Sequence, residues 1–417
     1  MPDLNATPNA SRIQIGIFGR RNAGKSSLMN ALTNQSAALV SDNPGTTTDP
    51  VFKAMEMLPL GPVTFIDTAG LDDVGSPLGE LRVKRSYDIL DRADLALLVI
   101  DAEIGVTEFE TGIAAAIRKK KIPAVMVVNK TDLQALPEGQ KQRWEAELQM
   151  DVLEVSATQG KGLHELKSAL VRIARKIEEE PFLAGDLVRP GDFAVLVIPI
   201  DKAAPKGRLI LPQQQVIRDV LEHDAMAVVT KEHELKATLE TLGKKPAVVI
   251  TDSQAFLKVA ADTPKEVPLT SFSILFARQK GNLVELVKGA KMVEKLKPGD
   301  KVLIAEGCTH HRQSDDIGTV KIPRWLRQTI GGELSFQWAS GQSLPEDLSP
   351  FQLVIHCGGC MLNRREMMHR ITKAKTQGIP IVNYGVLIAY LQGIFPRALE
   401  PFPEIREILN DVYDRND

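Results

Sequence analysis

The chain has 417 residues, of which 43% are hydrophobic and 25% charged, and its formal net charge is −2. At roughly 100–200 residues per domain, this length predicts two or three domains. The near-neutral charge favours neither a nucleic-acid partner nor an anionic membrane surface. No apolar run approaches the roughly 20 residues that span a bilayer, and the N-terminus lacks the apolar core of a signal peptide. We therefore expect a cytoplasmic protein with no membrane partner.

The first part of the chain alternates apolar, strand-like runs with helical patterns. This βαβ alternation predicts a mostly parallel sheet with helices on both faces. The segment 178–192, EEEPFLAGDLVRPGD, combines acids with Pro and Gly and is typical of a linker. We expect strands at residues 13–19, 63–67, 95–101, 124–129 and 152–156, and helices at 25–34, 107–120 and 162–178.

Two smaller α/β patterns follow, so we expect domains at residues 1–180, 185–268 and 269–417. The middle domain has no cysteine, and we expect it to pack on a neighbouring domain or on a second copy of itself. The expected strands of the middle domain are 193–200, 226–230 and 247–251, with helices at 213–222 and 232–241. The expected strands of the last domain are 301–306, 352–356 and 379–383, with helices at 364–376 and 385–392.

A phosphate-binding loop is predicted at residues 19–26, GRRNAGKS, which fit the pattern G-x-x-x-x-G-K-[ST]. The motif follows an expected strand and opens an expected helix, whose N-terminal N–H groups would cradle the β-phosphate. We expect Lys25 to span the β- and γ-phosphates and Ser26 to bind Mg²⁺. The first domain is therefore predicted to be a P-loop domain, although this motif alone leaves adenine and guanine nucleotides open.

Guanine specificity is predicted by residues 129–132, NKTD, which end another expected strand. The carboxylate of Asp132 can accept hydrogen bonds from guanine N1–H and from the 2-amino group, and adenine does not offer this pair. The dipeptide 156–157, Ser-Ala, follows a third strand and suits a backbone contact to guanine O6.

Two further motifs are predicted to contact the γ-phosphate and Mg²⁺. In residues 67–70, DTAG, Asp67 is expected to support Mg²⁺ through water, and the N–H of Gly70 to sense the γ-phosphate. In residues 44–49, PGTTTD, Thr47 is the expected Mg²⁺-binding threonine of a switch loop. Lys25, Thr47 and Gly70 are thus the expected catalytic residues.

All five motifs occur in order, and most fall where a strand stops, which is the edge at which open α/β sheets bind ligands. Together they predict a GTPase with GTP and Mg²⁺ as its cofactors. The expected nucleotide contacts are Gly19, Asn22, Ala23, Gly24, Lys25, Ser26, Ser27, Asp67, Asn129, Lys130, Asp132, Ser156 and Ala157.

Residues 11–178 resemble the bacterial Era/TrmE-like GTPases in these motifs. Leu71 follows DTAG, where Ras-type enzymes carry a water-positioning glutamine. The resemblance implies that K⁺, held in part by an asparagine of the phosphate loop, supplies the missing positive charge, and Asn22 stands at that position. We therefore expect slow hydrolysis that K⁺ stimulates. Glu80 is a weaker candidate for orienting water, and an ordinary exposed helix residue is the alternative.

The chain contains three cysteines, Cys308, Cys357 and Cys360, and all of them lie in its last third. An odd number in a chain without a signal sequence argues against a disulfide framework. The segments C-T-H, at 308–310, and H-C-G-G-C, at 356–360, each follow an expected strand, so the two can converge on one site. Three thiolates with imidazoles suit either a structural Zn²⁺ or an iron–sulfur cluster. The missing fourth cysteine favours a cluster, because it leaves one iron exchangeable.

The pattern C-T-H…H-C-G-G-C, joined to an N-terminal GTPase, resembles the family of [FeFe]-hydrogenase maturation GTPases, HydF, across the whole chain. The resemblance implies a GTPase domain, a dimerisation domain and a cluster domain, assembled as a homodimer. It makes Cys308, Cys357 and Cys360 the thiolates of a [4Fe-4S] cluster. His310 and His356 are candidate ligands, and hydrogen bonding to the cluster or to loops is the alternative for both.

The family also implies a scaffold that holds a [2Fe] subcluster precursor, which radical-SAM enzymes build, and delivers it to apo [FeFe]-hydrogenase. The GTPase would act as a regulatory switch. Two rival classes remain at the level of sequence. One is a ribosome- or tRNA-linked GTPase with a structural zinc domain, and the other is a metallochaperone that inserts a single metal ion. Near-neutral composition does not favour the first, and metal analysis separates both from a cluster protein.

Overall fold

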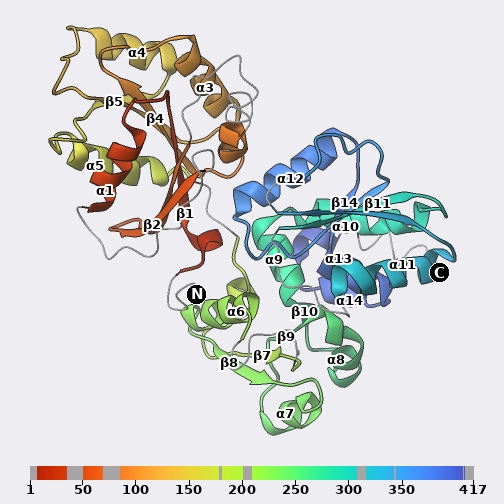
Figure 1. The fold of residues 1–417 in the computed structure, drawn as a ribbon. Coiled ribbons are helices and arrows are strands. Elements are labelled where there is room, and N and C mark those ends of the chain that lie inside the picture. Colours follow the sequence, from red (N-terminus) through yellow and green to blue (C-terminus); the bar gives the residue numbers. More distant parts are fainter. Residues whose placement is uncertain are drawn as a thin grey trace. The chain divides into compact units, whose positions relative to one another are not determined.

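The structure, a computed structural model, describes residues 7–34, 50–68, 85–177, 181–200, 209–307, 316–341, 344–406 and 408. The chain divides into two compact units, Met1–Glu179 and Glu180–Asp417 (Figure 1). The division into three domains at 1–180, 185–268 and 269–417 stays a prediction. No helix among the described residues is both long enough and apolar enough to cross a membrane.

The first unit is built on a six-stranded sheet with the order β2-β3-β1-β4-β5-β6. Its pairings are parallel except for that of β2 with β3. Strand β4 is buried along its whole length because helices cover both faces of the sheet. The strands are β1 (Ile13–Phe18), β2 (Val51–Met57), β3 (Gly61–Asp67), β4 (Leu95–Asp101), β5 (Ala124–Asn129) and β6 (Asp151–Glu154).

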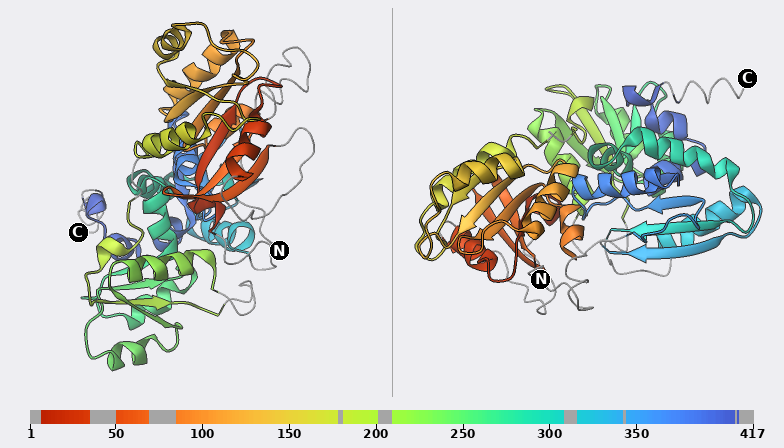
Figure 2. Two further views of the ribbon diagram at one scale, coloured as in Figure 1. Left: turned by 90° about the vertical axis from the view of Figure 1, so that its left-hand side faces the viewer. Right: turned by 90° about the horizontal axis from the view of Figure 1, so that it is seen from above.

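Two apolar layers hold helices against this sheet (Figure 2). Leu28 of α1 and Leu166 of α5 belong to one buried cluster, and Ile113 of α3 and Leu148 of α4 belong to another. The apolar side chains recur at helical spacing, so each helix buries one stripe. The helices are α1 (Lys25–Asn34), α3 (Glu108–Lys119), α4 (Gln140–Leu148) and α5 (Leu163–Ala174).

The predicted α/β fold with a P-loop domain is confirmed, while β2 and α4 were not predicted. Strand β2 lies at the edge of the sheet and alternates only partly between buried and exposed positions, so its period-2 signal is weak. Helix α4 contains few apolar residues, and Trp144 and Leu148 are the ones that it buries. Both elements depend on a neighbour that the local sequence does not reveal.

The second unit contains two four-stranded sheets, and the pairings within both are parallel. The first has the order β10-β9-β7-β8 and the second the order β12-β11-β13-β14. The strands are β7 (Phe193–Val197), β8 (Met226–Thr230), β9 (Val248–Thr251), β10 (Leu269–Ser271), β11 (Lys301–Glu306), β12 (Ser335–Ser340), β13 (Leu353–His356) and β14 (Ile381–Asn383).

The two sheets of this unit share one apolar core. Leu196 of β7, Leu275 of α9 and Leu303 of β11 all belong to the same buried cluster. Strand β10 runs directly into α9, so this helix connects the two sheets. The helices are α6 (Leu211–Glu222), α7 (Leu235–Thr241), α8 (Phe256–Asp262), α9 (Phe272–Lys280), α10 (Leu283–Lys291), α11 (Ile322–Ile330), α12 (Arg364–Thr376), α13 (Tyr384–Leu391) and α14 (Phe395–Leu399).

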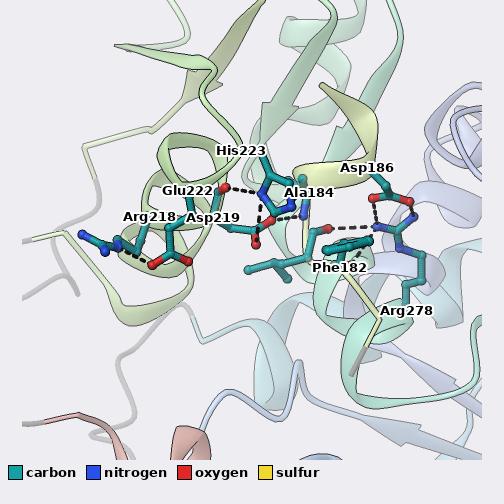
Figure 3. A network of polar contacts seen from close by, with 10 residues as sticks. Phe182, Ala184, Asp186, Arg218, Asp219, Glu222, His223 and Arg278 are labelled. Carbon is teal, nitrogen blue, oxygen red and sulfur yellow. Dashed lines mark hydrogen bonds and ion pairs between the residues drawn. The ribbon is translucent and has the colours of Figure 1, made fainter. Parts of the chain in front are cut away.

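The linker predicted at 178–192 is corrected by the structure, because from residue 181 onward the segment is packed into the second unit. Ala184 is fully buried, and Asp219 of α6 accepts hydrogen bonds from the backbone N–H groups of Ala184 and Gly185, each at 2.7 Å (Figure 3). A Cβ on Gly185 would lie 2.1 Å from the ring of His223. The glycine that reads as a sign of flexibility is therefore a requirement of close packing.

Candidate functional site

The phosphate-binding loop of the first unit joins β1 to α1 and needs glycine at two positions. Gly19 has φ 148°, and a Cβ there would lie 2.2 Å from the carbonyl oxygen of Val99. Gly24 has φ 84°, and a Cβ there would lie 2.2 Å from the side-chain nitrogen of Asn129. The loop is thus pressed against the ends of β4 and β5.

Lys25 lies inside this loop and is 6% exposed. Its ammonium donates hydrogen bonds to the carbonyl oxygens of Gly19, at 3.0 Å, and Arg20, at 2.7 Å. The positive charge is therefore held where the loop's backbone turns, at the N-terminus of α1. That position suits the charge of a bound phosphate group.

Asp67 and Ser26 form a pair of oxygen groups beside the loop. The Ser26 hydroxyl donates to Asp67 Oδ2 at 2.5 Å, and Asp67 Oδ1 is buried without a hydrogen-bond partner among the described residues. Burial raises the pKa of Asp67, while the Ser26 hydrogen bond and the charge of Lys25 act in the opposite direction. A buried carboxylate oxygen left over beside a hydroxyl is a donor set that fits Mg²⁺.

Asn129, at the end of β5, connects three of the predicted motifs. Its side-chain amide donates to the carbonyl oxygen of Ala23 in the phosphate loop at 3.0 Å. Its side-chain oxygen accepts from the backbone N–H of Ala157 at 3.1 Å. One side chain therefore connects the phosphate-binding loop with the two segments that are predicted to bind guanine.

The side chain predicted to read guanine, Asp132, is exposed and already has hydroxyl partners. Thr158 donates to its carboxylate at 3.3 Å, and hydrogen bonds from Ser156 and Thr158 lower the pKa of Asp132. The carboxylate therefore stays ionised as an acceptor at neutral pH. Lys130 has φ 66° and pairs with Asp101 at the end of β4, at 2.6 Å, which holds the NKTD segment on the sheet edge.

Sequence reasoning missed Glu110, which supports the phosphate loop from the start of α3. Its carboxylate is 1% exposed, accepts a hydrogen bond from the Thr107 backbone N–H at 2.9 Å, and lies 3.5 Å from Arg20 of the loop. The signal was present as the capping-box pattern Thr107-x-x-Glu110. The pattern predicts a helix start but does not indicate that the glutamate also faces Arg20.

Several predicted residues of the nucleotide site lie outside the described residues: Thr47, Gly70, Leu71 and Glu80. Asn22, the expected K⁺ ligand, is exposed at the tip of the phosphate loop and has φ 62°. This left-handed conformation is one that asparagine adopts more readily than most residues.

In the second unit, the predicted cysteine segments follow two neighbouring strands. Strands β11 and β13 pair in parallel, with Ala305 opposite His356. The backbone N–H of Cys357 donates to the carbonyl oxygen of Ala305 at 2.9 Å, and the N–H of Gly307 donates to Cys357 Sγ at 3.2 Å. The residue directly before Cys308 therefore lies against the thiol of Cys357.

Cys308, His310 and His311 lie outside the described residues. Within the described parts of the chain, no group of three or more His, Cys, Asp and Glu side chains is arranged to hold a metal ion. Neither Cys357 nor Cys360 forms a disulfide bond within the described residues. Two thiols on one glycine-containing loop, with the end of β11 beside them, are a donor set that fits the ligation of iron or zinc by cysteine.

The loop between the two cysteines is compact. Gly359 has φ 63°, and a Cβ there would lie 2.4 Å from the terminal carbon of Met367. Burial raises the pKa of the Cys360 thiol, and the charge of Lys280 opposes this shift. Lys280 is 3% exposed, although lysine side chains are usually solvated, and the helix that it ends was not predicted from the sequence.

Both ring nitrogens of His356, a predicted candidate ligand, have partners within the protein. Its ring is fully buried, Nδ1 lies 2.7 Å from the carbonyl oxygen of Cys357, and Nε2 lies 2.9 Å from the guanidinium of Arg370. Burial and the charge of Arg370 lower the pKa of His356 to about 3. The neutral ring therefore donates from Nδ1 and accepts at Nε2, which leaves it no lone pair for iron and does not support the prediction that it is a ligand.

A buried carboxylate and a phenol lie at the end of β11, near Cys357. Glu306, the last residue of β11, is 2% exposed, and the Tyr384 hydroxyl donates to it at 3.3 Å. Burial, with the charges of Cys357 and Glu306, raises the pKa of Tyr384. The phenol therefore stays protonated and acts as a hydrogen-bond donor next to the cysteine site.

Family models match three stretches of the chain. Residues 183–281 match the hydrogen maturase F dimerization domain, and residues 284–401 match the hydrogen maturase F tetramerization domain. Residues 14–130 match the 50S ribosome-binding GTPase family. The match to a tetramerization domain covers both described cysteines, and no sequence pattern predicted that form of assembly.

Curated relatives match the first unit. The tRNA modification GTPase MnmE of Synechococcus sp. (strain JA-3-3Ab) is 40% identical over 171 residues, covering 41% of this chain and 36% of that protein. GTPase Der of Kosmotoga olearia is 37% identical over 188 residues, covering 42% of each chain. The chain thus spans well under half of the length of the curated relatives that it matches.

Solved structures are similar only at a low level. Era of Aquifex aeolicus, bound to GDP·AlF4⁻, has a TM-score of 0.34 and 18% identity, covering 60% of this chain and 99% of that chain. The G domain of the FeoB iron transporter of T. maritima has a TM-score of 0.31 and 24% identity, covering 39% of this chain and 99% of that chain. These scores carry no argument about function.

Proposed function

The chain belongs to the hydrogen maturase F family, and from this premise we propose that it is a GTPase scaffold that holds a [4Fe-4S] cluster. The cluster ligands in this proposal are Cys308, Cys357 and Cys360. The observation that carries it is the hydrogen bond from the Gly307 N–H to Cys357 Sγ, at 3.2 Å. This bond places the chain just before Cys308 against the loop that carries the other two thiols.

Three thiolates leave one iron of a cubane without a cysteine, and an exchangeable iron of this kind suits a carrier. We propose that the protein holds the diiron subcluster precursor and transfers it to apo [FeFe]-hydrogenase. Radical-SAM maturation enzymes are the proposed partners that supply the precursor. His310 is the remaining histidine candidate for the open position, since both ring nitrogens of His356 are used within the protein.

The nucleotide site supports the GTPase half of the proposal. Lys25, at the turn of the phosphate loop, would neutralise charge on the β- and γ-phosphates. Ser26 and Asp67 offer oxygen groups to Mg²⁺, and one oxygen of Asp67 is unsatisfied among the described residues. Asp132 would accept the N1–H and amino hydrogen bonds of guanine. Hydrolysis is proposed to be slow and stimulated by K⁺ at Asn22, and to regulate the association of partners.

Assembly is proposed to be part of the function. The family models describe dimerization at 183–281 and tetramerization at 284–401. We therefore propose a homodimer through the domain at 185–268, with the cluster held in the domain at 269–417. A cytoplasmic location belongs to the same proposal.

A second candidate is a tRNA-linked GTPase with a zinc-binding C-terminal part, which the similarity to MnmE over 41% of the chain favours. A metallochaperone for one metal ion is the third. Metal analysis separates the three, because the cluster proposal requires sulfide and several irons per chain, whereas each rival requires one metal ion and no sulfide.

The test is quantification of iron, sulfide and zinc in protein purified and reconstituted without oxygen, followed by EPR of the reduced protein. We expect about four irons and about four sulfides per chain, with the signal of a reduced [4Fe-4S] cluster. One zinc per chain without sulfide would reject the cluster proposal. Substituting each cysteine with serine is the matched control and should lower iron content.

A further inference from the structure

We propose that Lys280 positions the loop of residues 357–362 and supplies a buried positive charge to the cluster held there. The inference rests on the proposed function, because it concerns the same cysteine site. Lys280 is not part of the cysteine pattern, and its helix is distant from the cysteines in sequence.

Lys280 is the last residue of α9, and its ammonium reaches into the cysteine loop. It donates to the carbonyl oxygens of Leu362 at 2.9 Å, Cys360 at 3.2 Å and Gly359 at 3.5 Å. With 3% of its surface exposed, the charge is removed from water. A buried ammonium needs such acceptors, so the carbonyl groups of this loop are drawn toward α9 and hold its turn in place.

A second contact connects the chain that follows the loop to the C-terminal end of α9. Arg364, the first residue of α12, donates to the carbonyl oxygen of Gln279 at 2.5 Å and to that of Gly281 at 3.2 Å. Lys280 thus donates into the loop, and Arg364 donates back to the residues on either side of Lys280. The two contacts together set the loop's position independently of any bound metal.

The charge of Lys280 also has an electrostatic consequence. Charges act strongly in a buried site because little water screens them. Adding an electron to an iron–sulfur cluster makes it more negative, so a nearby cation favours the reduced state and raises the reduction potential. A residue that only held the loop would not have this effect, and the reduction potential therefore separates the two roles.

Arg278 provides a matched control on the same helix. It is also buried, at 7% exposed. It pairs with Asp186 at 2.6 Å and donates to the carbonyl oxygen of Phe182 at 2.8 Å (Figure 3). Its guanidinium also lies over the ring of Phe402, at 4.9 Å. Removing it takes a buried cation from α9 while leaving the contacts of Lys280 with the cysteine loop, and those of Arg364 with α9, in place.

The experiment compares Lys280→Met, Lys280→Gln, Lys280→Arg and Arg278→Met in the full-length chain. The reduction equilibrium of the reconstituted cluster is measured by a potentiometric titration followed by EPR. We expect Lys280→Met and Lys280→Gln to disfavour reduction about tenfold, which is 59 mV for one electron. Lys280→Arg keeps the charge and should stay near the wild type, as should Arg278→Met.

A second readout needs no metal. In the metal-free protein, hydrogen exchange of the amides at 358–362 should be about tenfold faster in Lys280→Met than in the wild type, and close to wild type in Arg278→Met. A loss of cluster binding in Lys280→Met alone would also support the inference. Unchanged potential and exchange, or equal effects in Arg278→Met, would overturn it. If the wild type bound no iron and no sulfide, the proposed function would be rejected. The electrostatic role of Lys280 would then be rejected as well.

Discussion

Asn22 is the residue of the phosphate loop that is proposed to hold K⁺. It is exposed at the loop's tip with φ 62°, and Leu71 replaces the glutamine that Ras-type enzymes use to orient water. A cation at this place would offset charge that develops between the β- and γ-phosphates.

We therefore expect GTP turnover to be at least about tenfold faster in K⁺ than in Na⁺ at the same ionic strength. Asn22→Ala should lose most of this difference while still binding GDP. The measurement is phosphate release in the two salts, for the wild type and for Asn22→Ala. Equal rates in K⁺ and Na⁺ for the wild type would rule out the potassium mechanism.

His356 shows how burial changes the chemistry of a residue whose sequence context suggests metal binding. Its pKa is lowered to about 3 by burial and by Arg370, from about 6.5 in an unfolded chain. Below pH 6.5 the unfolded state therefore takes up a proton that the folded state does not. Stability is lost as the pH falls from 6.5 toward 3.

In the metal-free protein we expect this histidine alone to lower the free energy of unfolding by about 2 kcal/mol between pH 8 and pH 5. His356→Asn should be less stable overall, because Arg370 loses an acceptor, but should show a flatter pH dependence. Denaturation midpoints of the second unit at the two pH values give the comparison, and identical slopes in both proteins would contradict the assignment.

At the scale of elements, strand β8 is exposed in a way that bears on assembly. It lies at one edge of its sheet, and Val229 and Met226 are 49% and 42% exposed. An edge strand with apolar side chains is a template for pairing with another chain. This strand lies inside the region that matches a dimerization domain.

Val229→Lys is expected to weaken the dimer by about tenfold or more, because it places a charge on the edge strand. Leu257→Lys is the matched control, since Leu257 of α8 is 58% exposed but is not on a strand. Analytical ultracentrifugation over a range of concentrations measures both. A dimer unaffected by Val229→Lys would place the interface elsewhere.

For the whole molecule, the two units carry separate sets of functional residues. The described nucleotide residues lie in Met1–Glu179, and the described cysteines lie in Glu180–Asp417. Each unit has buried apolar clusters of its own. Damage to one site should therefore leave the other intact.

We expect Lys25→Ala to lower GTP turnover by about 100-fold or more while the iron content stays unchanged. Conversely, Cys357→Ser and Cys360→Ser should lower iron content and preserve GTP turnover. Phosphate release and iron analysis on the same preparations test both directions. Loss of both properties in one variant would show that the sites are coupled through folding.

The sequence by itself determined the motifs from which the nucleotide site is predicted, because they are short and contiguous and follow strands with strong apolar patterns. Strands at 95–101, 124–129 and 301–306 and helices at 25–34 and 364–376 were predicted at their observed bounds. Edge strands β2, β10 and β12 were missed. The mixed exposure of β2 and β12 leaves no clear alternation, and β10 has only 3 residues. The three cysteines could likewise be singled out from spacing alone.

Only the tertiary structure decided what surrounds those residues. Three residues near the cysteine loop carry no sequence signal that would link them to it. They are Lys280, Glu306 and Arg370. His356 is buried with both ring nitrogens hydrogen-bonded, and the predicted linker is packed structure from residue 181. The physical reason is the same in each case. Local sequence fixes backbone propensity and the chemistry of a motif, whereas burial, charge pairing and hydrogen-bond partners depend on which distant segments the fold brings together.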